Sequence, residues 1–202
     1  MNDFIIEDRE AIENVYILLP RFVTDPDEQP ELAEGKYLPA IVRDFEWENL
    51  EFTFVISPAR VRNEKGEDRY YYPGEREQYI ESALRQLAVE DNVNFRSDEF
   101  TLDFSLHQIM IELININRDL RLDREDIELG IKILGDINYE LIGRNSGGSE
   151  LYFRPIERLV IREQDGEIYY RAQFSQLFFS RTKQFDFCFP LMDANKTDLL
   201  KK

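Results

Sequence analysis

The sequence predicts an α+β protein, because segments with helical and with strand periodicity follow one another along a chain that is rich in apolar residues. Of the 202 residues, 43% are hydrophobic, and they include 15 Phe and 10 Tyr. A chain of this size buries most of its surface when it folds, in one or two domains. We expect an acidic N-terminal segment over residues 1–35, a single α+β domain over 36–180 and a C-terminal tail over 181–202.

The first 35 residues combine one apolar run with an excess of acidic side chains. The run at residues 15–19 is typical of a short buried strand, and an acidic, proline-bearing stretch follows at 24–31. The ten acidic residues of the segment are offset only by Arg9 and Arg21. Such a composition favours a solvated loop or arm, with an acidic docking arm as the functional alternative.

The next part of the chain predicts a β-hairpin. Every second residue of 50–56 is a large apolar one, which is the period of a strand with one buried face. A turn signal follows at 63–67, and residues 69–72, an arginine and three tyrosines, then return as a partner strand. We therefore expect the strands at 50–56 and 69–72 to pair.

Three segments have helical periodicity. The first, residues 75–90, carries acidic side chains in its first turn, where they favour the positive end of the helix dipole. A short strand over 100–104 leads to Ser105, which is a candidate N-cap for the second helix. Asp123 is a candidate cap for the third helix, and we expect Gly135 to end it. The predicted apolar faces are Ile80, Ala83, Leu84 and Leu87 in the first helix; Leu106, Ile109, Met110, Leu113 and Ile114 in the second; and Ile127, Ile131 and Leu134 in the third.

The last third of the chain predicts paired strands. Residues 139–142 and 151–154 flank one glycine-bearing turn, and residues 156–162 and 167–174 flank another. The order strand, helix, helix and strands is that of a winged helix-turn-helix. The sequence thus predicts a winged-helix-like domain with an N-terminal β-hairpin extension.

One stretch resembles the conserved region of plasmid replication initiator proteins. Residues 100–113 and 171–177 are similar to a helix and the closing strand of that region, so the resemblance covers roughly residues 70–180. It implies winged-helix domains that bind repeats at a plasmid origin, one of which can mediate dimerisation. The residues that carry the resemblance are Tyr71-Tyr72-Pro73, Arg76-Glu77, Ile80-Glu81, Ala83-Leu84-Arg85 and Leu87-Ala88.

The chain departs from that family in two respects. A second winged helix is expected to begin where this sequence ends, at Lys202. The helix that would enter the major groove, residues 124–132, holds three acidic residues against two basic ones. No base-reading residues are therefore carried over onto this helix.

The charge of the chain is strongly negative and unevenly distributed. The formal net charge is −16, which opposes nonspecific attraction to nucleic acid or anionic lipid. Residues 1–139 hold 32 acidic and 15 basic side chains, whereas residues 140–202 hold nine acidic and ten basic ones. Any contact with a polyanion is therefore expected in the last third of the chain.

Five arginines of that last third are the candidate nucleic-acid-binding residues. Two of them, with Val160 between, alternate in phase and share one face of a strand, near Tyr169 and Tyr170. The structural alternative is cross-strand pairing with nearby glutamates, namely Glu157, Glu163 and Glu167. The five candidates are Arg144, Arg154, Arg158, Arg162 and Arg171.

The sequence contains no recognisable catalytic or metal-binding set. Cys188 lies in an apolar run that favours core packing, and His107, the one histidine, is expected to be a partly buried structural residue. Asn117, Asp119 and Asp123 have spacing near that of a calcium loop, but Leu120 stands where such a loop needs glycine, so a capped interhelical loop is favoured. We expect no enzyme activity, cofactor, metal or small-molecule substrate.

Two functional hypotheses follow. The first is a non-catalytic winged-helix protein that binds DNA, or that assembles with partners on a nucleic-acid complex. A homodimer is one such assembly. The second is an acidic protein-interaction subunit on the same scaffold, without nucleic-acid contact. The acidic composition is also compatible with adaptation to salt. With no stretch of about 20 apolar residues and no basic leader, we expect a cytoplasmic protein that does not enter membranes.

Overall fold

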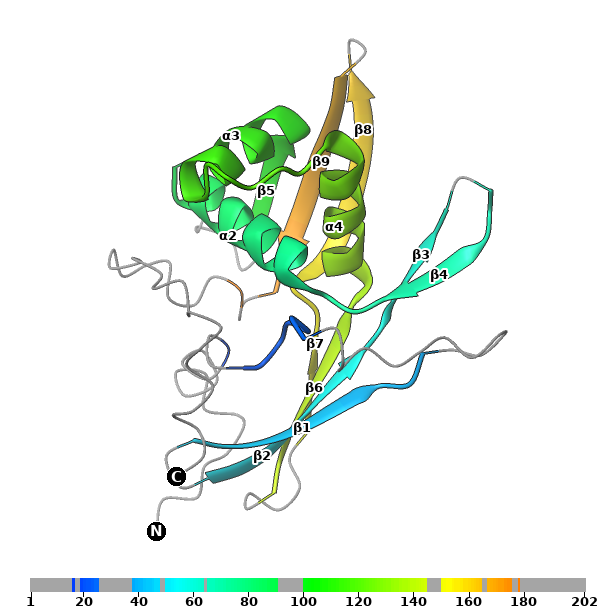
Figure 1. Ribbon diagram of the computed structural model, residues 1–202, viewed down its shortest axis with the longest axis vertical. Helices are drawn as coiled ribbons and strands as arrows, with labels where there is room; N and C mark the ends of the chain where they lie inside the picture. The colour runs from blue at the N-terminus through cyan, green and yellow to red at the C-terminus, as the bar shows by residue number, and fades with distance from the viewer. Residues whose placement is uncertain are drawn as a thin grey trace.

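A computed structural model of the chain (Figure 1) describes residues 16, 19–25, 38–47, 50–63, 65–90, 100–144, 150–164, 167–175 and 178. Most of the predicted acidic arm and the whole of the predicted tail, with Cys188, lie outside these residues. The helices in this part of the chain are α2 (Glu75–Glu90), α3 (Leu106–Ile116) and α4 (Arg124–Asp136). The strands are β1 (Ile41–Trp47), β2 (Leu50–Ser57), β3 (Ala59–Arg62), β4 (Asp68–Tyr71), β5 (Phe100–Ser105), β6 (Asn138–Gly143), β7 (Glu150–Phe153), β8 (Ile156–Gln164) and β9 (Glu167–Phe174).

The predicted α+β class is confirmed, and the strands form antiparallel sheets. A three-stranded sheet has the order β5-β9-β8, and the three helices cover one of its faces (Figure 1). A four-stranded sheet has the order β1-β2-β6-β7 and lies below it in that view. The strands β3 and β4 form a separate two-stranded hairpin. Apolar side chains from both larger sheets and from the helices belong to one hydrophobic core.

The three helices begin where their sequences predict, and most of their predicted apolar residues are buried. Ser105 and Asp123 each accept a hydrogen bond from the backbone N–H three residues later, which completes a capping box at the start of α3 and of α4. Gly130 allows α4 to approach α2 closely, because a Cβ there would lie 2.3 Å from Cδ1 of Ile80. α4 ends at Asp136, one residue beyond the predicted stop at Gly135.

The predicted pairing of residues 50–56 with 69–72 is wrong. β2 pairs with β1 and with β6, with Phe54 opposite Leu141, whereas β4 pairs with β3. The alternation of apolar residues specifies which face of β2 is buried but says nothing about its neighbours. The N-terminal extension is therefore a sheet with strands from two parts of the chain, and not a simple hairpin.

The strands β6 and β7 pair as predicted, with Tyr139 opposite Phe153, but they do not form the wing of the three-stranded sheet. β6 lies beside β2 instead. Its buried side chains, Tyr139 and Leu141, pack into the same core as Phe54. The hairpin of β8 and β9 is confirmed and belongs to the three-stranded sheet.

Several residue-level predictions are corrected. Tyr16 is buried as predicted, but its backbone is helical instead of extended. Met110 and Ile114 are exposed, because α3 packs against its neighbours through Ile109 and Leu113. His107, on the same outer side of α3, is exposed and not partly buried.

A buried ion cluster lies in the core and was not predicted. The carboxylate of Glu81 on α2 accepts hydrogen bonds from Arg21 at 2.5 and 2.6 Å and from Arg85 at 3.0 and 3.1 Å. Arg21 also donates to the hydroxyl of Tyr16, and Arg85 donates to the carbonyl of Phe178. The cluster therefore ties residues from near both ends of the chain to α2.

Candidate nucleic-acid interface

Three of the five candidate arginines lie on the solvent face of the three-stranded sheet, opposite the helices. On β8, Arg158 and Arg162 are exposed and lie opposite Gln173 and Tyr169 of β9. Between them, Val160 lies opposite Arg171. We call this surface the arginine face, and it consists of Arg158, Val160, Arg162, Tyr169, Arg171 and Gln173.

A β-bulge places the arginines of β8 on this face. The register of β8 against β9 shifts between Ile156 and Arg158, so Glu157 is an extra residue in the strand. Ile156 is fully buried opposite Phe174, whereas Arg158 is exposed. A regular strand would put these two side chains on the same face, because residues two apart share a face. The bulge thus keeps an isoleucine in the core and turns the following arginines to solvent.

The three arginines differ in how their charges are compensated. Arg171 forms a bidentate pair with Asp103 of β5, with N···O distances of 2.6 and 2.5 Å. Hydrogen bonds from Arg171 lower the pKa of Asp103, and the positive charges of Arg171 and Arg162 add to this effect. Within the described parts of the chain, Arg158 and Arg162 form no ion pair or side-chain hydrogen bond.

Two of the three predicted alternative partners, Glu157 and Glu163, form no ion pair with these arginines among the described residues, and the side chain of the third, Glu167, lies outside the described part of the structure. Glu163 lies opposite Ile168, in phase with the helix-covered face of the sheet. Glu157 is the bulge residue, and its partial burial raises its pKa. Of the two predicted tyrosines, Tyr169 belongs to the arginine face and is 38% exposed, whereas Tyr170 is buried against Phe104. Within the described residues, the face therefore offers two guanidinium groups that form no ion pair, beside an exposed aromatic ring.

Arg144 and Arg154 lie elsewhere. Arg144 follows β6 and pairs with Asp44 of β1, while its Nε donates to Thr53 at 2.8 Å. Arg154 follows β7 and donates to Asn138 of β6 at 2.7 Å. Both belong to the four-stranded sheet, so the structure does not bring the five candidates together. The sequence could not separate them, because it did not show that β6 and β7 join the sheet of β1 and β2 and not the three-stranded sheet.

The basic side chains at the start of α4 are already paired. Arg124 forms an ion pair with Glu128 one turn later, at 3.0 Å. Asp126 pairs with Arg76 of α2 at 3.4 Å. These two ion pairs engage Arg124 and Asp126 within the protein, which is in line with the expectation that α4 carries no base-reading residues.

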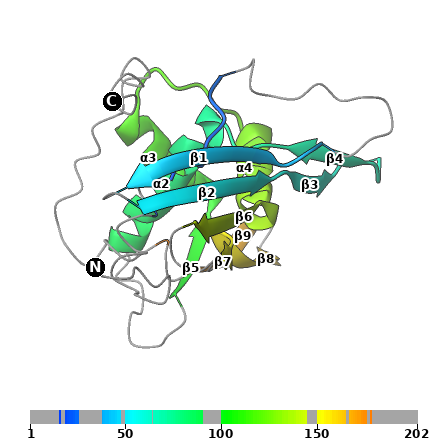
Figure 2. The same ribbon diagram turned by 90° about the horizontal axis from the view of Figure 1, so that it is seen from below.

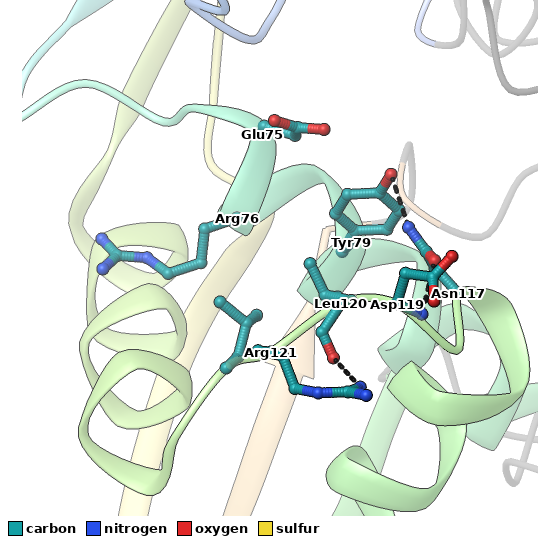
Figure 3. Close-up of a pocket in the computed structure, with 8 residues that line it drawn as sticks. Glu75, Arg76, Tyr79, Asn117, Asp119, Leu120 and Arg121 are labelled. Carbon is teal, nitrogen blue, oxygen red and sulfur yellow. Dashed lines mark hydrogen bonds between the residues drawn. The ribbon is translucent and has the colours of Figure 1, made fainter.

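The loop between α3 and α4 borders an open pocket of about 320 Å³ (Figure 3). Its polar groups are engaged within the protein: Asn117 binds the hydroxyl of Tyr79 and the backbone of Asp119, and Arg121 donates to the carbonyls of Arg118 and Leu120. The loop is the capped interhelical connection that the sequence favours. The lining residues are Glu75, Arg76, Tyr79, Asn117, Asp119, Leu120, Arg121 and Leu122.

Two general properties of the described residues bear on function. They contain no cluster of three or more His, Cys, Asp or Glu side chains that could hold a metal ion. Within the same residues, no helix is long and apolar enough to cross a membrane.

Comparison with known proteins gives matches by structure alone. No family model and no curated protein matches the sequence. A crystal structure of domain 2 and domain 3 of RctB matches with a TM-score of 0.54 and 13% identity, over 82% of this chain and 61% of that chain. A second structure of RctB domains 2-3 matches with a TM-score of 0.54 and 12% identity, over 88% of this chain and 60% of that chain. At this identity the likeness concerns the fold, and the chain spans about 60% of the length of those structures.

Proposed function

We propose that this chain is a non-catalytic, initiator-like winged-helix protein that binds duplex DNA through its arginine face. A role in DNA replication is supported by the resemblance of residues 70–180 to plasmid replication initiators, and the likeness of the fold to domains 2 and 3 of RctB is consistent with it. The exposed, unpaired guanidinium groups of Arg158 and Arg162 are the observation that carries the proposal.

The order of elements supports the winged-helix part of the proposal. A helix (α2), a strand (β5), two helices (α3 and α4) and a hairpin (β8 and β9) follow one another, and the strand order is β5-β9-β8. The hairpin of β8 and β9 corresponds to the wing. The pair β6 and β7 is an insertion between α4 and the wing.

The chemistry of the arginine face supports contact with phosphates. Guanidinium groups bind phosphate oxygens with charge-assisted hydrogen bonds, and such contacts supply most nonspecific affinity for DNA. Since Arg124 is paired with Glu128 and residues 124–132 hold three acidic side chains, we expect the wing side to carry the binding and α4 to contribute little. Binding of this kind is expected to fall steeply as the salt concentration rises.

The test is a titration of fluorescently labelled duplex DNA at low and moderate salt. The double variant Arg158→Glu/Arg162→Glu replaces two attractions by two repulsions, so we expect it to lose at least about 100-fold in affinity. The matched control, Arg144→Glu/Arg154→Glu, changes the net charge equally on the other sheet and is expected to keep most of the affinity. Thermal melts of both variants check that they are folded.

The outcomes separate the hypotheses. Equal losses in both variants would show that total charge, and not the arginine face, governs binding. No salt-sensitive binding by the wild type at low ionic strength would overturn the DNA-binding function. The dimer implied by the resemblance and the cytoplasmic location stay predictions.

The second candidate function, an acidic protein-interaction subunit, is favoured by a specific surface on the four-stranded sheet. Its solvent face carries carboxylates together with exposed apolar side chains. The two candidates are compatible, because the arginine face and this surface lie on different sheets.

A further inference from the structure

The four-stranded sheet has one face in the core and one face in solvent. Phe52, Phe54 and Ile56 of β2 are buried on the core side, so the alternate residues Glu51, Thr53 and Val55 point away from it. The same alternation runs through β1, β6 and β7 in the observed register. Figure 2 views the molecule from below, with β1 and β2 in front of the helices.

Apolar side chains occupy part of this solvent face. Val42 is 61% exposed, and Tyr152 is 66% exposed, which is unusual for side chains of their size on a regular sheet. Val42 lies opposite Val55, and Ile142 lies beside Thr53 on the neighbouring strand. Ile142 is a diagonal neighbour of Val55, and Glu140 lies between Val55 and Tyr152 in the register. We call Val42, Val55, Ile142 and Tyr152 the apolar strip.

Carboxylates surround the strip. Glu46 and Glu51 are direct cross-strand partners, an arrangement of like charges that costs stability. Glu140 lies opposite Tyr152, and Glu150 accepts a hydrogen bond from the Tyr152 hydroxyl at 3.0 Å. Hydrogen bonds with Glu140 and Glu150 raise the pKa of Tyr152. We call the apolar strip and its carboxylates the acidic face, and it consists of Val42, Asp44, Glu46, Glu51, Val55, Glu140, Ile142, Glu150 and Tyr152.

Most of these carboxylates lack a cation within the described residues. Asp44 is paired with Arg144, and hydrogen bonds from Thr53 and Arg144 lower its pKa. No lysine or arginine of the described ranges forms an ion pair with the other four, Glu46, Glu51, Glu140 and Glu150. The acidic face thus combines the apolar strip with four carboxylates that form no ion pair among the described residues, beside the neutralised pair of Asp44 and Arg144.

We propose that the acidic face is a docking site for a protein segment in which lysine or arginine alternates with apolar residues. The apolar side chains of such a segment cover Val42 and Tyr152. Its cations neutralise Glu46 with Glu51 on one side and Glu140 with Glu150 on the other. A guanidinium or ammonium group over the exposed ring of Tyr152 adds a cation–π contact. Duplex DNA and anionic lipid are repelled by the same charges, so charge complementarity selects a cationic protein partner.

The probe for this test is a fluorescent twelve-residue peptide in which lysine and valine alternate. Two further peptides keep one feature each: one alternates lysine with glycine, and one alternates glutamate with valine. We expect the lysine–valine peptide to bind in a salt-sensitive way, the lysine–glycine peptide to bind about tenfold more weakly, and the glutamate–valine peptide not to bind.

Variants locate the binding. Glu140→Lys/Glu150→Lys is expected to weaken binding of the lysine–valine peptide by about tenfold or more, because two attractions become two repulsions. The control Asp119→Lys/Glu125→Lys makes the same change in net charge at two exposed residues, one in the loop before α4 and one in the first turn of α4. It is expected to change binding about twofold at most. Tyr152→Ser removes the largest exposed ring without changing charge and is expected to weaken binding as well.

Each outcome decides the proposal. Equal weakening by the acidic-face pair and by the control pair would assign binding to the overall charge of the protein, and would overturn it. Equal affinity for the lysine–valine and lysine–glycine peptides would exclude a role for the apolar strip and would also overturn the proposal. No binding of the lysine–valine peptide would overturn it as well. Because Arg158→Glu/Arg162→Glu leaves the acidic face intact, peptide binding by that variant separates this inference from DNA binding.

Discussion

At the scale of single residues, the buried cluster around Glu81 is the most demanding feature of the molecule. Burial acts to raise the pKa of Glu81, but the positive charges and hydrogen bonds of Arg21 and Arg85 outweigh it, so the net shift is downward. The Nε of Arg21 is buried without a hydrogen-bond partner in the described structure. Such clusters are costly to desolvate and costly to break.

We therefore expect Glu81→Gln to destabilise the fold by about 3–5 kcal/mol at pH 7, because it leaves two buried guanidinium groups without a counter-charge. Urea denaturation at pH 7 measures this difference. The matched control is Glu128→Gln, which removes a partner of an exposed surface pair and is expected to cost less than about 1 kcal/mol.

The same cluster predicts a pH dependence. The folded-state pKa of Glu81 is lowered, so its contribution to stability is present above the unfolded pKa and is lost as the pH falls through the folded value. The stability difference between wild type and Glu81→Gln should therefore shrink below about pH 4, near the pKa of an unperturbed glutamate. A difference that stays constant from pH 7 down to pH 3 would contradict the lowered pKa.

At the scale of elements, β8 shows how one extra residue decides which side chains reach solvent. Ile156 fills the core opposite Phe174, and the bulge at Glu157 reverses the phase of all that follows. If Glu157 were paired as part of a regular strand, either Ile156 would leave the core or the arginines would enter the core. The arginine face thus depends on a backbone irregularity as well as on residue type.

Deletion of Glu157 tests this dependence. We expect the variant to keep the arginine face and most of its DNA affinity, because Ile156 and Arg158 become neighbours, and regular pairing then leaves Ile156 opposite Phe174 and Arg158 opposite Gln173. Glu157→Ala keeps the length of the strand and is expected to change stability by about 0.5 kcal/mol or less. Loss of DNA binding by a folded deletion variant would show that the bulge itself, and not only the phase of the strand, is needed for the arginine face.

At the scale of the whole molecule, one core joins two surfaces of opposite charge. The net charge of −16 hides this division, because the arginine face and the acidic face belong to different sheets. Buried residues of both sheets, such as Phe54 and Phe104, pack into the same core as Leu84 of α2. The two surfaces are therefore expected to form and to melt together.

Leu84→Asp tests the shared core. Leu84 is fully buried, and an unpaired carboxylate there costs several kcal/mol, so we expect the variant to be unfolded or to melt far below the wild type. Gln78→Asp, on the exposed side of the same helix near its N-terminus, is expected to melt close to the wild type. Loss of one sheet only, measured by amide hydrogen exchange, would contradict a single cooperative core.

The local sequence patterns of this protein are sufficient to predict its individual helices and most of its strands. The spacing of Ile127, Ile131 and Leu134, together with the capping residue Asp123, is enough to specify α4, because helical period and caps act within a few residues. The alternation of Phe100, Leu102 and Phe104 specifies β5 in the same way. The excess of positive charge in the last third of the chain likewise located the arginines that reach the arginine face.

Only the tertiary structure decided which strands are neighbours and which charges meet. Strand alternation does not encode a partner, so the positions of β2 and β6, and with them those of Arg144 and Arg154, depend on the packing of a shared core. The bulge at Glu157 and the pairing of Arg21 with Glu81, 60 residues away in sequence, arise from long-range contacts. Such contacts form where distant segments bury apolar surface together, and no local pattern records them.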